Sequence, residues 1–337
     1  MQVARVRPVA VPRRWAIALS LFAFLVTLAI MNLAYQGRPW GALAYIGVGA
    51  ASVAAWRRPM VAAGFVIATS LFLQLAHAGI GYSDQTDISR MALERTLTGE
   101  SPYGYVYTNR VGGLNPFPYG PLAMLTAQLA PAIEVVALAG TLALVAWRQA
   151  WITLAVVAGF PWMIYIATMG GNDGLPAFGV TLGMLLLQSH PRLGMATLAV
   201  AGAVKPHVAT FFLPAIGYAG WTAGAWLVGM SAILWSPVLS WGVGNYLESL
   251  RYAAEAKTPL GWQRNTIPLP WVRVLAIPLT FAGLFVRRWE HAVWLGSAAF
   301  VAVMFFGEWG SLGYAIVFLP IAGIALETGG RCSRGRG

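Results

Sequence analysis

The segment from Tyr82 to Tyr119, YSDQTDISRMALERTLTGESPYGYVYTNRVGGLNPFPY, is a polar island between long apolar stretches. Its charged side chains are Asp84, Asp87, Arg90, Glu94, Arg95, Glu100 and Arg110. The stretches on either side are almost free of charge. A loop of this length and polarity between apolar segments is more often functional than a plain connector. We therefore expect the rest of the chain to be a frame for residues 80–120.

The composition is typical of a membrane protein. Of the 337 residues, 58% are hydrophobic and only 10% are charged, whereas soluble domains carry about 25% charged residues. Apolar runs of about 16 to 22 residues recur from one end of the sequence to the other, and a helix of that length crosses a bilayer. We predict a single all-α integral membrane domain over residues 1–337, a polytopic bundle of about 10–12 transmembrane helices.

Clusters of basic residues predict the orientation of this bundle. The first 14 residues hold four arginines and no acid, and basic clusters recur after residues 56, 188 and 286 and in the tail, residues 327–337. Such clusters mark cytoplasmic segments, so we expect a multi-pass protein of the plasma membrane with both termini in the cytoplasm. Residues 80–120 then form a large extracytoplasmic loop after the third span, and residues 241–266 form a second outer loop.

The predicted spans are residues 15–34, 40–56, 60–79, 121–147, 150–169, 175–188, 193–221, 222–240, 267–286, 290–306 and 312–326. Two of them allow two interpretations. Pro131 and Glu134 interrupt one, which is either a kinked helix or a short interfacial helix over residues 122–130 followed by a span. Residues 193–221 are either one helix with Lys205 at mid-depth or a hairpin with Lys205 at its outer tip. The distribution of charge favours the hairpin.

Asp84 and Asp87 stand at the start of a predicted helix, residues 88–98, which Gly99 ends. One interpretation is helix capping, because a carboxylate at a helix N-terminus satisfies free amides and the dipole. Capping explains one aspartate well and two less well. The other interpretation is a general base that takes the proton from an acceptor hydroxyl as it attacks an activated carbon.

Lys205 is the most informative cation, because an ionisable residue within an apolar segment is a functional candidate by default. A lysine at a hairpin tip can also simply reach the lipid headgroups. In a functional role Lys205 would bind a lipid-linked phosphate as a point charge, with His207 beside it. Further positive charge comes from the second outer loop and its edge: Arg251, Lys257, Arg264 and Arg273. Of these we assign Arg264 to the same phosphate site.

Asn172 and Asp173 lie in the sequence Gly-Gly-Asn-Asp-Gly between two predicted spans. This composition is suited to a polar turn, yet the turn would lie on the same outer face as Asp84 and could bind substrate there. Tyr103 and Tyr119 follow prolines in the second half of the polar island. Their rings suit a sugar or headgroup surface, although tyrosine and proline are also ordinary at the point where a chain enters a membrane.

Cofactor and nucleic-acid motifs are missing from the sequence. The one cysteine, Cys332, is in the basic tail, and the four histidines lack the spacing of metal ligands. There is no dinucleotide fingerprint and no Walker A sequence, so we predict no organic cofactor. The sequence does not decide whether a divalent cation takes part. The net charge of +11 is interpreted as contact with anionic membrane lipids rather than with nucleic acid.

Several short motifs occur in a fixed order. They are A-x-x-x-x-L-x-G-x-x-P-Y from Ala92 to Tyr103, F-x-Y-x-P-L from Phe117, G-x-N-D from Gly170 and A-x-K-P from Ala203. With an aspartate before them in the same early outer loop, this order resembles the GT-C superfamily of integral membrane glycosyltransferases. It is most similar to the bacterial polyprenol-phosphate-mannose-dependent mannosyltransferases of glycosyltransferase family 87, the DUF2029 group. The resemblance covers residues 80–215.

The resemblance implies an inverting transfer of a sugar, mannose in that family, from a polyprenyl-phosphate donor to a hydroxyl of a lipid or glycan acceptor outside the membrane. It assigns the general base to the loop aspartate, and the family spacing fits Asp84 better than Asp87. Lys205, with His207 or an outer-loop arginine, would stabilise the departing lipid phosphate. Asn172 and Asp173 would hold sugar hydroxyls or the acceptor. The superfamily also allows a divalent cation.

The main alternative is a transporter or a flippase for lipid-linked sugars, without transfer chemistry. Such a protein is expected to show inverted repeats and polar sites at the midplane of the membrane. We find helices broken by proline but no repeat, and the polar residues gather at one face. An O-antigen ligase or polymerase usually carries its large loop late in the chain. A non-catalytic scaffold would leave Lys205 and the loop carboxylates unexplained.

Overall fold

The computed structural model describes residues 84–110, 113–158, 171–255, 269–306 and 312–328, together with residues 58, 61, 64, 67, 68 and 71. The first two predicted spans, Arg264 and the basic tail after residue 328 lie outside the described residues. The described part is almost entirely helical, with a single two-stranded sheet. For these residues the prediction of an all-α fold is confirmed.

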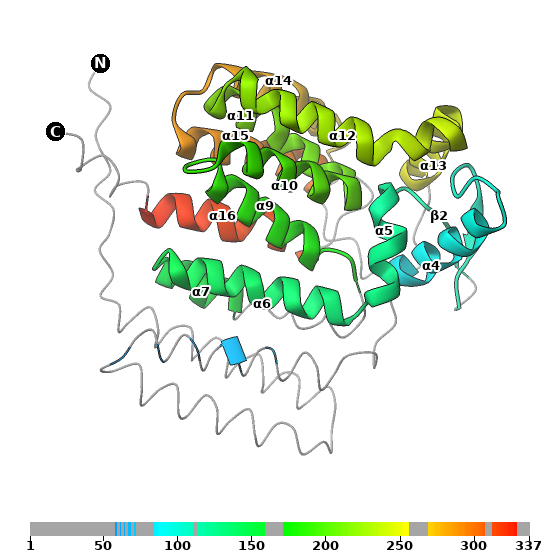
Figure 1. Ribbon diagram of the computed structural model, residues 1–337, viewed down its shortest axis with the longest axis horizontal. Helices are drawn as coiled ribbons and strands as arrows, with labels where there is room; N and C mark the ends of the chain where they lie inside the picture. The colour runs from blue at the N-terminus through cyan, green and yellow to red at the C-terminus, as the bar shows by residue number, and fades with distance from the viewer. Residues whose placement is uncertain are drawn as a thin grey trace, which may run out of the picture.

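The polar island forms a compact group of short elements at one end of the helical bundle (Figure 1). In chain order these are helix α4 (Asp84–Leu97) and strands β1 (Val106–Thr108) and β2 (Leu114–Pro116). Helix α5 (Pro121–Thr126) and the turn η1 (Ala127–Leu129) follow the island directly. The strands pair antiparallel, with Tyr107 opposite Asn115. Helix α13 (Val243–Glu255) lies at the same end of the molecule, so most of the predicted second outer loop that is described is a helix.

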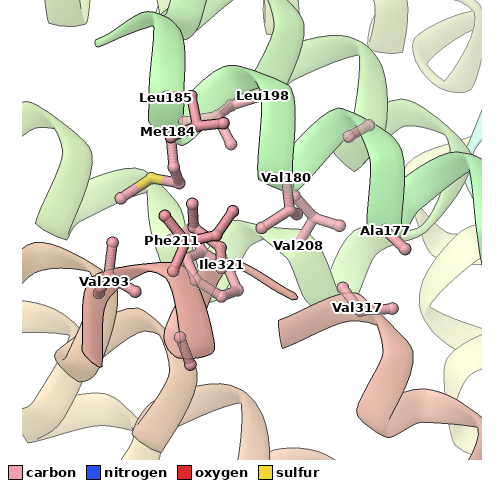
Figure 2. Packing of buried hydrophobic residues seen from close by; sticks show 14 of the residues in the cluster. Ala177, Val180, Met184, Leu185, Leu198, Val208, Phe211, Val293, Val317 and Ile321 are labelled. Atoms are coloured by element: carbon pink, nitrogen blue, oxygen red, sulfur yellow. The ribbon is translucent and has the colours of Figure 1, made fainter. Parts of the chain in front are cut away.

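The bundle itself contains the remaining elements. They are α6 (Ala132–Trp147), α7 (Trp151–Ala158), α9 (Gly174–Leu186), α10 (Pro191–Val204), η2 (Pro206–Phe211), α11 (Phe212–Ala219), α12 (Trp221–Trp241), η4 (Pro270–Leu275), α14 (Ala276–Ala282), η5 (Gly283–Phe285), α15 (Trp289–Phe305), η6 (Leu312–Tyr314) and α16 (Ala315–Thr328). Helix α9 packs on α6, α10 and α16, and α10 also packs along α12. Apolar side chains from these elements interlock in the centre, among them Val180, Leu198, Phe211 and Ile321 (Figure 2).

Among the described residues, one helix is long and apolar enough to cross a membrane, α12. The pair formed by α5–η1 and α6 would be a second if it counts as one bent span. Helices α9, α10, α15 and α16 are apolar but shorter, between 10 and 17 residues. The predicted number of spans therefore stays a prediction.

The structure resolves the interrupted segment 121–147 into two helices. The axes of α5–η1 and α6 differ in direction by 97°. Pro131 stands at the corner, where its missing N–H cannot continue a helix. The carbonyls left free there are bound by Arg90, which donates to Ala127 O at 3.1 Å and to Ala130 O at 3.2 Å. The interpretation as a short helix followed by a longer one is confirmed.

The structure also decides between the two interpretations of residues 193–221, because the chain reverses at Lys205. Helix α10 begins beside the end of α9, where the Gly194 backbone packs on Gly183 O. Helix α11 returns to that same end: Arg287 Nη1 donates to Gly217 O at 2.9 Å, and the neighbouring Trp289 Nε1 donates to Met184 O at 2.7 Å. The segment is thus a hairpin, and Lys205 is at its turn.

Candidate functional site

Six segments of the chain bring polar side chains together where the bundle meets the polar island. The first residue of α4, the approach to α5, the first turn of α6, the turn before α9, the α10–η2 junction and η6 all contribute. The side chains that they bring are Asp84, Tyr119, Glu134, Asn172, Asp173, Lys205 and Tyr314. We call this group the polar cluster.

Lys205 is the centre of the polar cluster. Its side chain is 2% exposed, and Nζ forms an ion pair with Asp173 Oδ1 and a hydrogen bond of 3.2 Å to Asn172 Oδ1. The ring centroids of Tyr314 and Tyr119 lie 4.5 Å and 5.9 Å from Nζ. A lysine enclosed in this way does not reach the lipid headgroups, so that interpretation is wrong. Its charge is balanced within the protein, as a buried charge requires.

The turn that carries Asn172 and Asp173 is held from two sides. Gln85 of α4 accepts the backbone N–H of Asn172 through Oε1 at 3.2 Å. Glu134 of α6 accepts the N–H of Leu175 through Oε2 at 3.0 Å, and its side chain is 1% exposed. Asp173 occupies the N-cap position of α9 but makes no capping hydrogen bond of its own. Glu134 satisfies an amide of that first turn instead, which leaves the Asp173 carboxylate to Lys205.

The two aspartates of α4 have different surroundings. Asp84 is half-buried, and its Oδ2 accepts a hydrogen bond of 3.3 Å from Asn115 Nδ2. Burial raises the pKa of Asp84 above its ordinary value, while amides of the first helical turn and the charge of Lys205 act in the opposite direction. Asp87 is buried and ion-paired, with Arg110 Nη2 at 3.1 Å from Oδ1. Asp84 is the aspartate whose carboxylate lies within electrostatic range of Lys205 and carries no ion pair of its own among the described residues.

A pair of basic side chains, His207 and Arg273, lies beside the polar cluster. His207 is in η2 and Arg273 in η4, and both of these turns pack on α15. His207 is within electrostatic range of Lys205 and of Arg273. His207 Nδ1 and Arg273 Nε are buried without a hydrogen-bond partner. Buried polar groups are almost always paired. Arg273 Nε therefore retains donor capacity for an anion, and His207 Nδ1 can donate to one in the tautomer that carries its proton there.

Four of the eight unpartnered buried polar atoms among the described residues belong to this end of the structure. Besides His207 Nδ1 and Arg273 Nε, they include Asp87 Oδ2 and Asn172 Nδ2. The nitrogen atoms among them can stabilise an anion. The Asp84 carboxylate, which lies within electrostatic range of Lys205, can take a proton from a hydroxyl.

Tyr103, which was predicted to bind substrate, does not join this arrangement. Tyr103 is 2% exposed and its hydroxyl donates to Tyr119 O at 3.2 Å. Its ring packs on Phe117 and Tyr246, with centroid distances of 5.4 Å and 5.0 Å. The structure thus assigns Tyr103 to the apolar core of the outer elements, which does not favour a role in substrate binding. Arg264 lies outside the described residues.

Sequence reasoning missed part of the polar cluster. Glu134 was interpreted only as an interruption of a span, although a carboxylate in an apolar run is itself a signal of function. Arg273 was grouped with cations of the second outer loop, and only the fold brings it to His207. Nothing in the sequence distinguishes Gln85, Asn115 and Tyr314, because their importance comes from partners that are distant along the chain.

The described residues contain no group of three or more His, Cys, Asp or Glu side chains placed to hold a metal ion. Comparisons of the chain with protein-family models, with curated proteins and with solved structures found no match.

Proposed function

We propose that this chain is a membrane glycosyltransferase that moves a sugar from a polyprenyl-phosphate donor to a hydroxyl of a lipid or glycan acceptor. The observation that carries the proposal is the convergence of Asp84 with Lys205, Asp173 and Asn172, beside the unpartnered donors of His207 and Arg273. A base and an anion site lie next to each other, as the transfer requires. Mannose is the sugar implied by the family resemblance.

Asp84 is the general base in this proposal. The acceptor oxygen forms a bond to the anomeric carbon of the donor as the bond from that carbon to the phosphate oxygen breaks, and the configuration inverts. The acceptor proton goes to the Asp84 carboxylate, whose basicity is increased by burial because burial raises its pKa. Asp87 is less suited to this role, because its charge is already used by Arg110.

The leaving group is a lipid phosphate that carries away the bonding electron pair. His207 and Arg273 supply its hydrogen bonds, and Arg264 adds charge from the second outer loop. Lys205 contributes less than its charge suggests, since Asp173 neutralises it in the protein. We assign Lys205 to holding the Asn172–Asp173 turn, from which Asn172 Nδ2 is available to a sugar hydroxyl.

The proposal places the protein in the plasma membrane as a multi-pass enzyme with its site on the outer face. Large apolar side chains on α12 support a surface that faces lipid: Trp226, Val228, Ile233 and Leu239 are 48%, 63%, 67% and 73% exposed. Arg148 and Arg287 contact Gln188 and Gly217 at the opposite end of the bundle from Lys205. Cations at that end agree with a cytoplasmic side there.

Sugar transfer by the purified, lipid-reconstituted protein tests the proposal. The donor is radiolabelled polyprenyl-phosphate-mannose, the acceptor is a membrane lipid extract, and wild type is compared with Asp84→Asn and Asp87→Asn. We expect Asp84→Asn to lose transfer by about 10²–10⁴-fold, the usual contribution of a general base, while Asp87→Asn keeps most of it. Gel filtration and melting temperature show whether each variant is folded.

Two results would contradict the proposal. If wild type transfers neither mannose, arabinose nor glucose from such donors, a transporter or flippase becomes the better interpretation. If transfer is observed and neither substitution lowers it, the chain is a transferase with its base elsewhere.

A further inference from the structure

One β-hairpin supplies a polar partner to each aspartate of α4. Asn115 on β2 donates to Asp84 Oδ2 at 3.3 Å, and Arg110, in the turn after β1, lies 3.1 Å from Asp87 Oδ1. A neutral amide thus faces one carboxylate and a full positive charge faces the other. The charged partner balances the charge of its carboxylate, whereas the amide can orient the other carboxylate without adding a charge.

The backbone around Asn115 is fixed from both directions. Asn115 pairs with Tyr107 across the hairpin, and the Tyr107 hydroxyl is itself bonded to Pro102 O at 2.8 Å. On the other side Phe117 is fully buried, and Gly120 N–H donates to Val204 O at 3.1 Å. The strand is therefore tied both to the outer elements and to the hairpin turn that carries Lys205.

We infer that Asn115 is a positioning residue for Asp84: its side-chain amide holds the carboxylate in one orientation and favours the charged form that can accept a proton. The inference rests on the proposed role of Asp84 as general base. Asn115 itself need not contact substrate. It acts as the oriented donor that a catalytic carboxylate needs in order to keep a single productive geometry.

The charged and titratable groups around Asp84 determine the direction of the expected effect. Lys205 favours the charged carboxylate and Asp87 disfavours it, and the hydroxyls of Tyr119 and Tyr314 lie within electrostatic range. The Asn115 amide acts in the same direction as Lys205, because a donor hydrogen-bonded to the carboxylate stabilises the charged form. Without that amide, Asp84 should hold its proton up to a higher pH.

The test measures protonation of Asp84 directly. Dicyclohexylcarbodiimide reacts with protonated carboxyl groups, so labelling of Asp84, measured by mass spectrometry across a pH series, falls as the carboxyl ionises. We expect the midpoint to rise by about one pH unit in Asn115→Ala, the effect of losing a hydrogen bond to a charged group. Asn115→Asp, which keeps the shape but adds a like charge, should raise it by about one to three units.

Arg110→Gln is the matched control, because it removes the partner of Asp87 from the same hairpin. It should leave the labelling midpoint of Asp84 nearly unchanged. All measurements on Asp84 are repeated in an Asp87→Asn background, so that the two sites cannot be confused. Unchanged Asp84 midpoints in both folded Asn115 variants would overturn the inference.

The transfer assay separates this inference from the proposed function. If Asp84 is the base, the acidic limb of the kcat/KM profile moves to higher pH in the Asn115 variants by as much as the labelling midpoint does. If the midpoint moves but the wild type transfers no sugar, the contact between Asn115 and Asp84 stands and the assignment of Asp84 as general base is overturned. If both profiles move together, the positioning role is supported.

Discussion

The core of the bundle and Lys205 at the centre of the polar cluster are both almost fully buried, but they are held in place by different forces. Val180, Phe211 and Ile321 in the core are each 0% exposed and contact apolar side chains from several helices (Figure 2). Lys205 is 2% exposed but depends on Asp173 and Asn172. Apolar contact is non-directional and shared among many neighbours, whereas a buried charge depends on a few specific partners. We therefore expect the two regions to respond differently to loss of a side chain.

Loss of the partner of Lys205 should have the largest effect on stability. Asp173→Ala leaves the Lys205 ammonium buried without its counter-charge, and breaking a buried pair in this way costs about 3–5 kcal/mol. Thermal unfolding in detergent measures the loss. The matched control is the double variant Asp173→Leu with Lys205→Met, which removes both charges and should recover most of the stability. A double variant as unstable as Asp173→Ala would show that volume, rather than charge, governs the polar cluster.

The core should respond to truncation with a loss of stability alone. Leu198 on α10 is fully buried, so Leu198→Ala should cost about 2–5 kcal/mol through lost burial and the cavity that remains. In the folded fraction kcat/KM for sugar transfer should stay near the wild-type value, because no polar partner is lost. Leu193→Ala on the same helix is the control: Leu193 is 58% exposed, and its loss should cost about 0.5 kcal/mol or less. A large fall in kcat/KM for Leu198→Ala would contradict the expectation that the core affects stability alone.

Gly120 packs directly on the hairpin that carries Lys205, so a change there should affect both stability and activity. A Cβ at this position would overlap the carbonyl oxygen of Ala203 and lie 3.0 Å from its Cα. Gly120→Ala must therefore push the polar island away from the hairpin of Lys205, at about 1–3 kcal/mol. Because Tyr119 moves with it, transfer should fall as well as stability. Gly229→Ala on α12 is the control: nothing lies within 4 Å of a Cβ there, and stability should rise by about 0.5–1 kcal/mol.

Much of the fold could be predicted because its signals are local. The break at Pro131, the end of α4 at Gly99 (φ +84°) and the turn at Lys205 all follow from a residue type that cannot continue a helix or is unlike its surroundings. Helix α4 begins four residues before the predicted start, because Asp84 is the first residue of the helix rather than a residue that precedes it. Helix α13 was missed because its polar residues suggested a loop, although its apolar positions recur at helical spacing.

The polar cluster was predicted in part, for a different physical reason. Asn172, Asp173 and Lys205 were found because polar side chains in apolar surroundings are costly and are kept only with partners. Those partners could not be predicted: the bond from Asn172 to Gln85 joins residues 87 positions apart. The burial of Tyr103 likewise follows from its contacts with Phe117 and Tyr246, which only the folded chain creates.

Asp84 tests the difference between the two regions most closely, because burial of its carboxylate should lower stability while it supports the proposed role as general base. Its folded pKa is raised by burial, so the folded protein binds the proton more tightly than the unfolded chain does. The stabilisation from that protonation is present below the unfolded pKa and is lost as the pH rises through the folded pKa. At neutral pH the buried charge of Asp84 therefore lowers the free energy of unfolding.

The variant Asp84→Asn removes this charge and keeps a side-chain oxygen that can accept the hydrogen bond from Asn115. We expect the variant to melt at a higher temperature than wild type at pH 7, while its sugar transfer falls by about 10²–10⁴-fold. The gain should shrink as the pH falls and the wild-type carboxyl becomes protonated. A gain that is independent of pH would mean that shape, not charge, separates Asp84 from the core.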